Sequence, residues 1–119
     1  MELHAVSKKI EDKIALLEQG RESLKDKVTV LVNASANYDK QLAITLLKLE
    51  NKAIPEWEGQ DCSKLAKSNM KKIAEGMCWK YKLDADTADK QYRLTLTRLE
   101  CIKQELNGFQ SINKYSGDI

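Results

Sequence analysis

The chain has 119 residues, of which 42% are hydrophobic, 32% charged and 6% aromatic, and its net charge is +2. This length suits one domain, and the nearly neutral charge gives no reason to expect a nucleic-acid partner. Scarce aromatics and plentiful charge favour long helices with apolar stripes over a broad globular core.

A reversal is predicted at residues 54–60, near the middle of the chain. Pro55, the only proline, lacks the N–H that a helix interior needs and biases Ile54 away from helical angles. Gly59 permits angles that other residues resist, and Asp61 or Ser63 can cap a new helix. The sequence therefore predicts a single helical domain over residues 1–112, with one arm at 2–53 and a second at 61–112. Residues 113–119 are predicted to be a frayed tail.

Both arms carry apolar or small residues at a mean step of about 3.5, which is helical and close to a heptad. In the first arm this stripe runs through Leu3, Val6, Ile10, Ile14, Leu17, Leu24, Val28, Leu31, Ser35, Tyr38, Leu42, Leu46 and Leu49. In the second arm it runs through Cys62, Ala66, Met70, Ile73, Met77, Tyr81, Ala88, Tyr92, Thr95, Leu99, Ile102, Leu106 and Phe109. Folding the arms about Trp57 would place Asn33 opposite Tyr81.

Each arm contains a segment that is predicted to interrupt its helix. The β-branched run at 28–32 is followed by cap-prone residues at 33–37, and Asp84 and Asp86 are good N-caps in the second arm. The predicted fold is all-α, an antiparallel helical hairpin with breaks near 33–37 and 84–86. These breaks would give an up-down three- or four-helix bundle, and unbroken arms would give a long coiled-coil hairpin. A strand at 28–32 is an alternative, although the sequence offers no partner strand.

Glycines mark further weak points in the predicted helices. Gly20 and Gly76 each lower helix stability, since glycine costs about 1 kcal/mol relative to alanine in a helix interior. Gly108 is a candidate C-cap near the predicted end of the second arm.

No residue pattern points to catalysis, a cofactor or a metal. His4 is the only histidine and lacks nearby partners, and the phosphate-loop, dinucleotide, zinc-protease and nucleophile-elbow motifs are absent. Cys62, Cys78 and Cys101 have no C-x-x-C spacing and are predicted to be small buried hydrophobes. We expect a non-enzymatic, cytoplasmic protein with free thiols and neither a signal peptide nor a transmembrane span.

Candidate binding residues gather near the predicted bend. A basic patch for anionic lipid or phosphate would comprise Lys48, Lys52, Lys64, Lys67, Lys71 and Lys72. The alternative is a solvated face whose charge is balanced by Glu50, Glu56, Glu58, Asp61 and Glu75. No aromatic residue interleaves the lysines, which argues against single-stranded nucleic acid. Trp57 and Trp79 are candidate partner-binding anchors, although Trp57 could instead cover the end of the bundle and Trp79 could be core.

Two segments of the first arm resemble the first long core helix of BAR and F-BAR domains. Residues 16–25 and 36–42 share its rhythm of small residues, tyrosine, a basic residue and leucine. The resemblance implies an antiparallel helical dimer whose basic face binds curved anionic membrane. Those domains use three or more long helices per protomer, whereas this chain holds two arms, and no functional residue is carried over.

Two functions follow from this sequence. The first is a protein–protein interaction or scaffolding module whose stripe supports self-association, as in a homodimer, or binds a partner helix. The alternative is peripheral binding to anionic membrane through the lysines.

Overall fold

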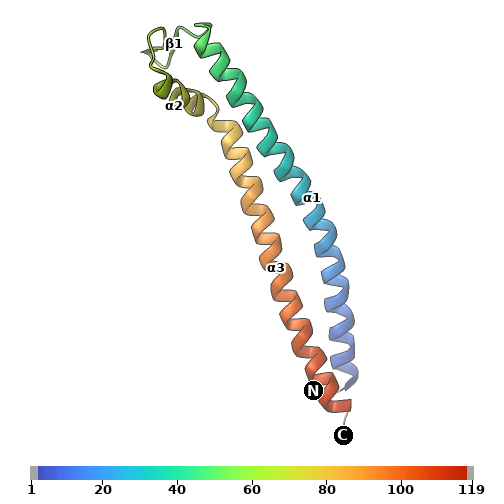
Figure 1. Cartoon of the computed structure of the whole chain (residues 1–119). Coiled ribbons are helices and arrows are strands. Elements are labelled where there is room, and N and C mark those ends of the chain that lie inside the picture. The colour runs from blue at the N-terminus through green and yellow to red at the C-terminus, as the bar shows by residue number, and fades with distance from the viewer. Residues whose placement is uncertain (1–2, 118–119) are drawn as a thin grey trace. The chain divides into compact units, whose positions relative to one another are not determined.

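The computed structural model describes residues 3–117, which form three α-helices and a small two-stranded sheet (Figure 1). The elements are α1 (Leu3–Glu50), β1 (Glu56–Trp57), β2 (Gln60–Asp61), α2 (Lys67–Met77) and α3 (Trp79–Gly117). The predicted all-α helical hairpin is confirmed, with Pro55 in the connection that follows α1. The described chain comprises two compact units. Unit 1 combines the residues up to Thr29 with those from Lys90 onward, and unit 2 runs from Val30 to Asp89.

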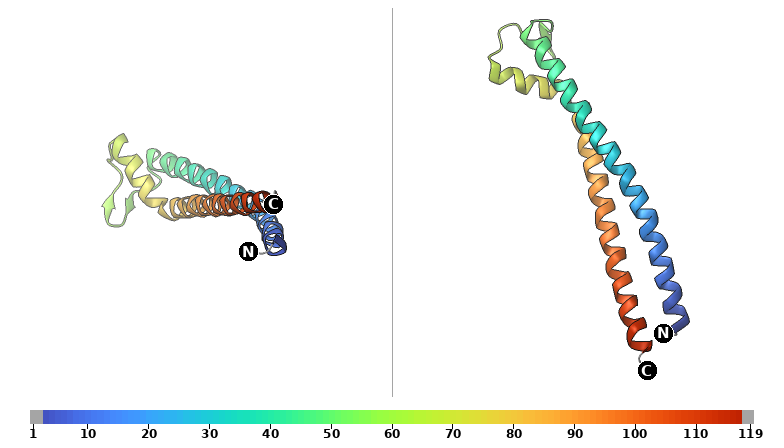
Figure 2. Two further views of the ribbon diagram at one scale, coloured as in Figure 1. Left: turned by 90° about the horizontal axis from the view of Figure 1, so that it is seen from below. Right: turned by 45° about the vertical axis from the view of Figure 1, so that its right-hand side comes forward.

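Unit 1 is an antiparallel pair made from the first part of α1 and the last part of α3 (Figure 2). Lys9 Nζ lies 5.7 Å from the centroid of the Phe109 ring, and Lys13 forms an ion pair with Glu105. Folding about Trp57 would have placed Leu94 opposite Gly20, whereas Leu99 packs there and Leu94 is 68% exposed. The register differs because the connection between α1 and α3 runs from residue 51 to residue 78, so its middle lies after Trp57.

Unit 2 holds a core around Leu49, Cys62 and Ala74. These three residues are at most 1% exposed, and α2 lies at the end of α1 to enclose them (Figures 1 and 2). The half-buried residues packed against them are Leu42, Leu46, Ile54, Trp57, Leu65, Met70, Ile73 and Met77. Burying one such large apolar side chain stabilises the fold by about 2 kcal/mol, so this cluster fixes the reversal.

The reversal contains a β-hairpin that the sequence analysis missed. Glu56 pairs with Asp61 and Trp57 with Gln60, which leaves a two-residue loop. Glu58 and Gly59 in this loop have φ angles of 49° and 81°. Positive φ at both positions is the mark of a type I′ turn, whose twist matches that of the flanking strands. Glycine adopts a positive φ without strain, so Gly59 suits its turn position. Glu58 has a Cβ, and a positive φ is less favourable for it.

The predicted break near 33–37 is wrong, because α1 continues without interruption from Leu3 to Glu50. The alternative strand at 28–32 is also wrong. Valine and threonine cost only about 0.5 kcal/mol each in a helix, which packing readily overrides. The Thr29 hydroxyl also donates a hydrogen bond to the Lys25 carbonyl at 3.1 Å, so its hydrogen-bonding need is met within the helix.

The predicted break near 84–86 is wrong as well, since the second arm is interrupted at Cys78 instead. Lys82 N–H donates to the Cys78 carbonyl at 3.1 Å, so helical hydrogen bonding is established before Asp84. An N-cap at Asp84 or Asp86 would have no unpaired N–H groups to satisfy.

The ends of the second arm also differ from the prediction. The helix restarts at Lys67, with Ala66 at the N-cap and no side-chain capping bond. Asp61 Oδ1 instead accepts hydrogen bonds from the Ser63 hydroxyl (2.6 Å) and the Ser63 N–H (2.9 Å), and both bonds lower the pKa of the Asp61 carboxyl below its ordinary value. At the other end α3 runs past residue 112 to Gly117, so Gly108 lies inside a helix. Residues 118 and 119 of the predicted tail lie outside the described residues.

Gly76 and Gly108 should respond oppositely to alanine. A Cβ at Gly76 would lie 2.8 Å from Trp57 Cη2, whereas a Cβ at Gly108 would meet nothing within 4 Å. Gly108→Ala should therefore stabilise the protein by about 1 kcal/mol. Gly76→Ala should destabilise it by about 1–3 kcal/mol, because the rigid indole must move.

The midpoint of urea unfolding, followed by far-ultraviolet circular dichroism, measures both changes. A rise in the midpoint for both variants would contradict the packing of Trp57 against α2.

Candidate functional site

The six predicted patch lysines all lie in unit 2, and all are exposed. Lys48 is in the last turn of α1, Lys52 follows that helix, Lys64 precedes α2, and Lys67 begins it. Because α2 packs on Leu49 through Ala74, the two lysine groups gather at the same end of unit 2.

No carboxylate of the described residues forms an ion pair with any patch lysine. The acidic residues that were expected to balance the lysines do not do so through direct contacts. Lys67 also stands in the first turn of α2, which contains no acidic residue. The positive end of a helix dipole favours anions, so the lysine and the dipole add to one positive field there.

Lys52 has an unusual backbone conformation for a lysine. Its φ is +56°, and its N–H donates to the Leu49 carbonyl at 3.1 Å while Ala53 N–H donates to the Lys48 carbonyl at 2.8 Å. These two bonds form a Schellman motif that closes the C-terminus of α1. The left-handed position in this motif is usually glycine, because a Cβ costs about 1 kcal/mol there.

The two tryptophans occupy different environments. Trp57 is half-buried in the unit 2 core, and its ring packs over Gly76, so it covers the end of that core. Trp79 is 55% exposed at the start of α3, where Lys80 Nζ lies 5.6 Å from its ring centroid. Of the two candidate anchors, only Trp79 presents a largely open ring.

The stripe of α1 in unit 1 is only partly covered by α3. Leu3, Ile14 and Val28 remain 50%, 41% and 39% exposed. The residues that contact α3 include Lys9, Lys13 and Gly20, which lie to one side of the stripe at helical spacing. Within the described part of unit 1 only Val6 and Leu106 are buried, and they are 1% and 8% exposed.

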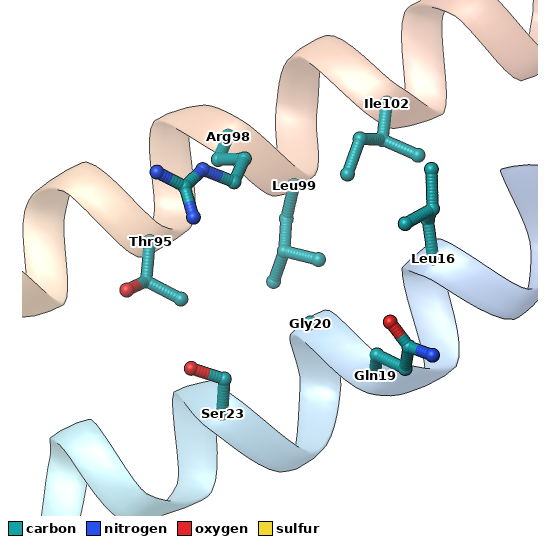
Figure 3. A pocket seen from close by; sticks show the side chains of 8 residues that line it. All are labelled: Leu16, Gln19, Gly20, Ser23, Thr95, Arg98, Leu99 and Ile102. Atoms are coloured by element: carbon teal, nitrogen blue, oxygen red, sulfur yellow. The ribbon is translucent and has the colours of Figure 1, made fainter.

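A hollow of about 200 Å³ lies beside Gly20 and was not anticipated from the sequence. Figure 3 shows Leu99 pointing from α3 toward Gly20, with Arg98 at the rim near Thr95. A Cβ at Gly20 would collide with Leu99 Cδ2, so the glycine permits this close approach. Gly20 had been interpreted only as a weak point, and its place beside the apolar stripe was the available signal.

The described residues hold no group of three His, Cys, Asp or Glu side chains that could bind a metal ion. His4 is exposed near the start of α1. Cys62 and Cys78 are buried as predicted, and Thr45 Oγ1 lies 3.4 Å from Cys78 Sγ. Cys101 is exposed, which corrects the prediction that all three thiols are buried.

Within residues 3–117, every helix falls short of the apolar length needed to cross a membrane. No protein-family model matches the chain, and the searches of curated proteins and of solved structures likewise gave no match. Any functional conclusion therefore depends on the surfaces of the two units.

Replacing Lys52 by glycine should stabilise the protein even though it removes a charge. Relief of the left-handed strain should raise the free energy of unfolding by about 1 kcal/mol. Lys52→Ala is the matched control, because it removes the same charge and keeps the Cβ. Urea unfolding should separate the two variants, and equal midpoints would mean that the backbone at residue 52 is not strained.

Proposed function

We propose that this protein is a non-enzymatic helical interaction or scaffolding module that associates through the apolar stripe of α1. The main candidate partner is a second copy of the chain. A helix of another protein is the alternative partner for the same face. The observation that carries this proposal is the exposure of Leu3, Ile14 and Val28 in unit 1.

The stripe is exposed because a helix pair supplies each helix with one neighbour. Leu3, Ile14 and Val28 follow heptad-compatible spacing along one side of α1, while α3 covers the side that contains Gly20. A further helix laid along the stripe would cover these side chains with knobs-into-holes packing. Each exposed leucine, isoleucine or valine contributes about 25 cal/mol for every Å² of apolar surface that such packing buries.

A helix is the occupant that this surface suits. All described residues of unit 1 are helical, so their backbone groups pair within their own helices. Unit 1 therefore offers no strand edge to an extended peptide, and recognition through an amphipathic helix is the available mode.

Ile14→Glu combined with Val28→Glu should strongly weaken self-association. Two carboxylates in an apolar seam should weaken dimerisation about a hundredfold. Ala15→Glu combined with Thr29→Glu is the control, because each of these exposed positions lies one residue along the same helix. Sedimentation equilibrium over a wide concentration range should show dimers for the wild type and the control and monomers for the stripe variant.

A wild-type protein that stays monomeric at millimolar concentration would refute the self-association. A dimer that is insensitive to the stripe variant would place the interface elsewhere.

The unpaired lysines favour a second candidate function, peripheral binding to an anionic membrane. Six exposed lysines at one end of unit 2 lack ion-pair partners among the described residues, so no neighbouring carboxylate has to be displaced. Each lysine near an anionic surface contributes about 1 kcal/mol at moderate ionic strength.

Charge reversal at Lys67, Lys71 and Lys72 should reduce vesicle binding about a hundredfold, because three favourable contacts of about 1 kcal/mol are lost. The control reverses Lys8, Lys90 and Lys103, which are exposed residues of unit 1, and changes the net charge equally. Co-sedimentation with vesicles of phosphatidylcholine and phosphatidylserine at low salt measures the difference. Absence of wild-type binding at low salt would exclude this function, since added salt only weakens such contacts.

A further inference from the structure

A second surface of unit 1 has chemistry that differs from the stripe. Two neighbouring hollows, of about 200 and 350 Å³, share Ser23, Thr95 and Arg98. Together they form a groove between α1 and α3 that extends from Leu16 to Lys27 on the α1 side, about 16 Å along the helix. Helical spacing places this groove on the other side of Gly20 from Ile14 and Val28.

The shape of the groove follows from Gly20. Because Gly20 has no side chain, Leu99 packs directly against the backbone of α1 there. No side chain of α1 at that position fills the hollow (Figure 3). The edges of the groove keep exposed apolar side chains, with Leu16 42% and Leu94 68% exposed. A third helix can set apolar residues into such a groove, whereas the open hollow would enclose a small ligand only in part.

The charge of the groove selects its partner. Lys27 and Arg98 line it, and no aspartate or glutamate does. Arg98 makes no ion pair within the described residues. Gln19, Ser23 and Thr95 supply further polar groups between the apolar edges. A helix that presents carboxylates to both cations would be complementary, and a basic helix would be repelled.

We infer that this groove binds an acidic amphipathic helix of a partner protein. Leucines of that helix would pack against Leu16, Leu94 and Leu99, and its carboxylates would pair with Lys27 and Arg98. The inference adds a second surface to the proposed interaction module and names the chemistry of its partner. It uses neither Ile14 nor Val28, so the stripe and the groove can be tested separately.

The test uses the full chain and two labelled synthetic helices of about 21 residues, which is long enough for helix formation. Both peptides carry leucines at the same heptad positions, and their flanking positions carry glutamate in one and lysine in the other. Fluorescence anisotropy at low and at physiological salt measures binding. The acidic peptide should bind at least about tenfold more tightly than the basic one, and added salt should weaken its binding.

Lys27→Glu combined with Arg98→Glu should reverse the preference, so that the basic peptide binds more tightly. Lys27→Gln combined with Arg98→Gln should weaken the acidic peptide without favouring the basic one, and this milder variant serves if the reversal impairs folding. Lys8→Glu combined with Lys103→Glu is the control with equal net charge, since both residues are exposed and neither lines the groove.

Equal binding of both peptides, absence of binding, or a preference that ignores the groove variants would overturn the inference. Sedimentation of the same variants tests whether a second copy of the chain occupies the groove instead. Loss of the dimer when Lys27 and Arg98 are both replaced by glutamate would assign the groove to a second copy. A dimer lost only in the stripe variant, together with no peptide binding, would leave the proposed self-association standing and remove the acidic partner.

Discussion

Two helices packed side by side cannot enclose a core, and this limit shapes unit 1. Each helix has one neighbour, so any apolar surface wider than the line of contact stays in water. The line of contact contains Gly20 and the Lys13–Glu105 ion pair, and it leaves Leu3, Ile14 and Val28 of the stripe exposed beside it. An exposed ion pair of this kind contributes at most about 1 kcal/mol, so little of the pair's stability comes from its centre. The proposed association with a further helix would bury the apolar surface that the pair leaves in water.

In unit 2 the segment that follows α1 provides the additional packing that a pair of helices lacks. The residues after α1 form a hairpin and the short helix α2, which together cover Leu49 from several sides. Trp57 closes this core over Gly76. The same packing leaves Lys67 and its neighbours on the outside of α2, so the basic patch is a consequence of how the core is closed. Lys52 is less easily explained by packing, because the Schellman motif would accept glycine there at lower cost.

The periodic positions of the sequence were sufficient to predict helices, a reversal around Pro55 and the all-α class, because these features depend on local spacing. The positions of the breaks could not be predicted in this way. Asp84 and Asp86 have the chemistry of N-caps, but a cap acts only where N–H groups are unpaired, and the hydrogen bonds that begin at Cys78 had already satisfied them. Likewise the hairpin at 56–61 depends on two positive φ angles, of which only the one at Gly59 has a sequence signal.

The surfaces were harder to predict than the elements, for a related reason. Lysine side chains are rarely buried, so the six patch lysines could be identified, whereas the role of Gly20 depends on which residue of α3 lies opposite. In the observed register the residue of α3 opposite Gly20 is Leu99 and not Leu94. Gly20 then lies at the floor of the groove, and Arg98 lies at its rim. The register of the pair therefore decides the chemistry on each side of it. One side of α1 is left apolar and suits another apolar helix, while the groove side is left basic and suits an acidic one. The proposed module would present two such unlike faces, and each face would bind a different kind of helix.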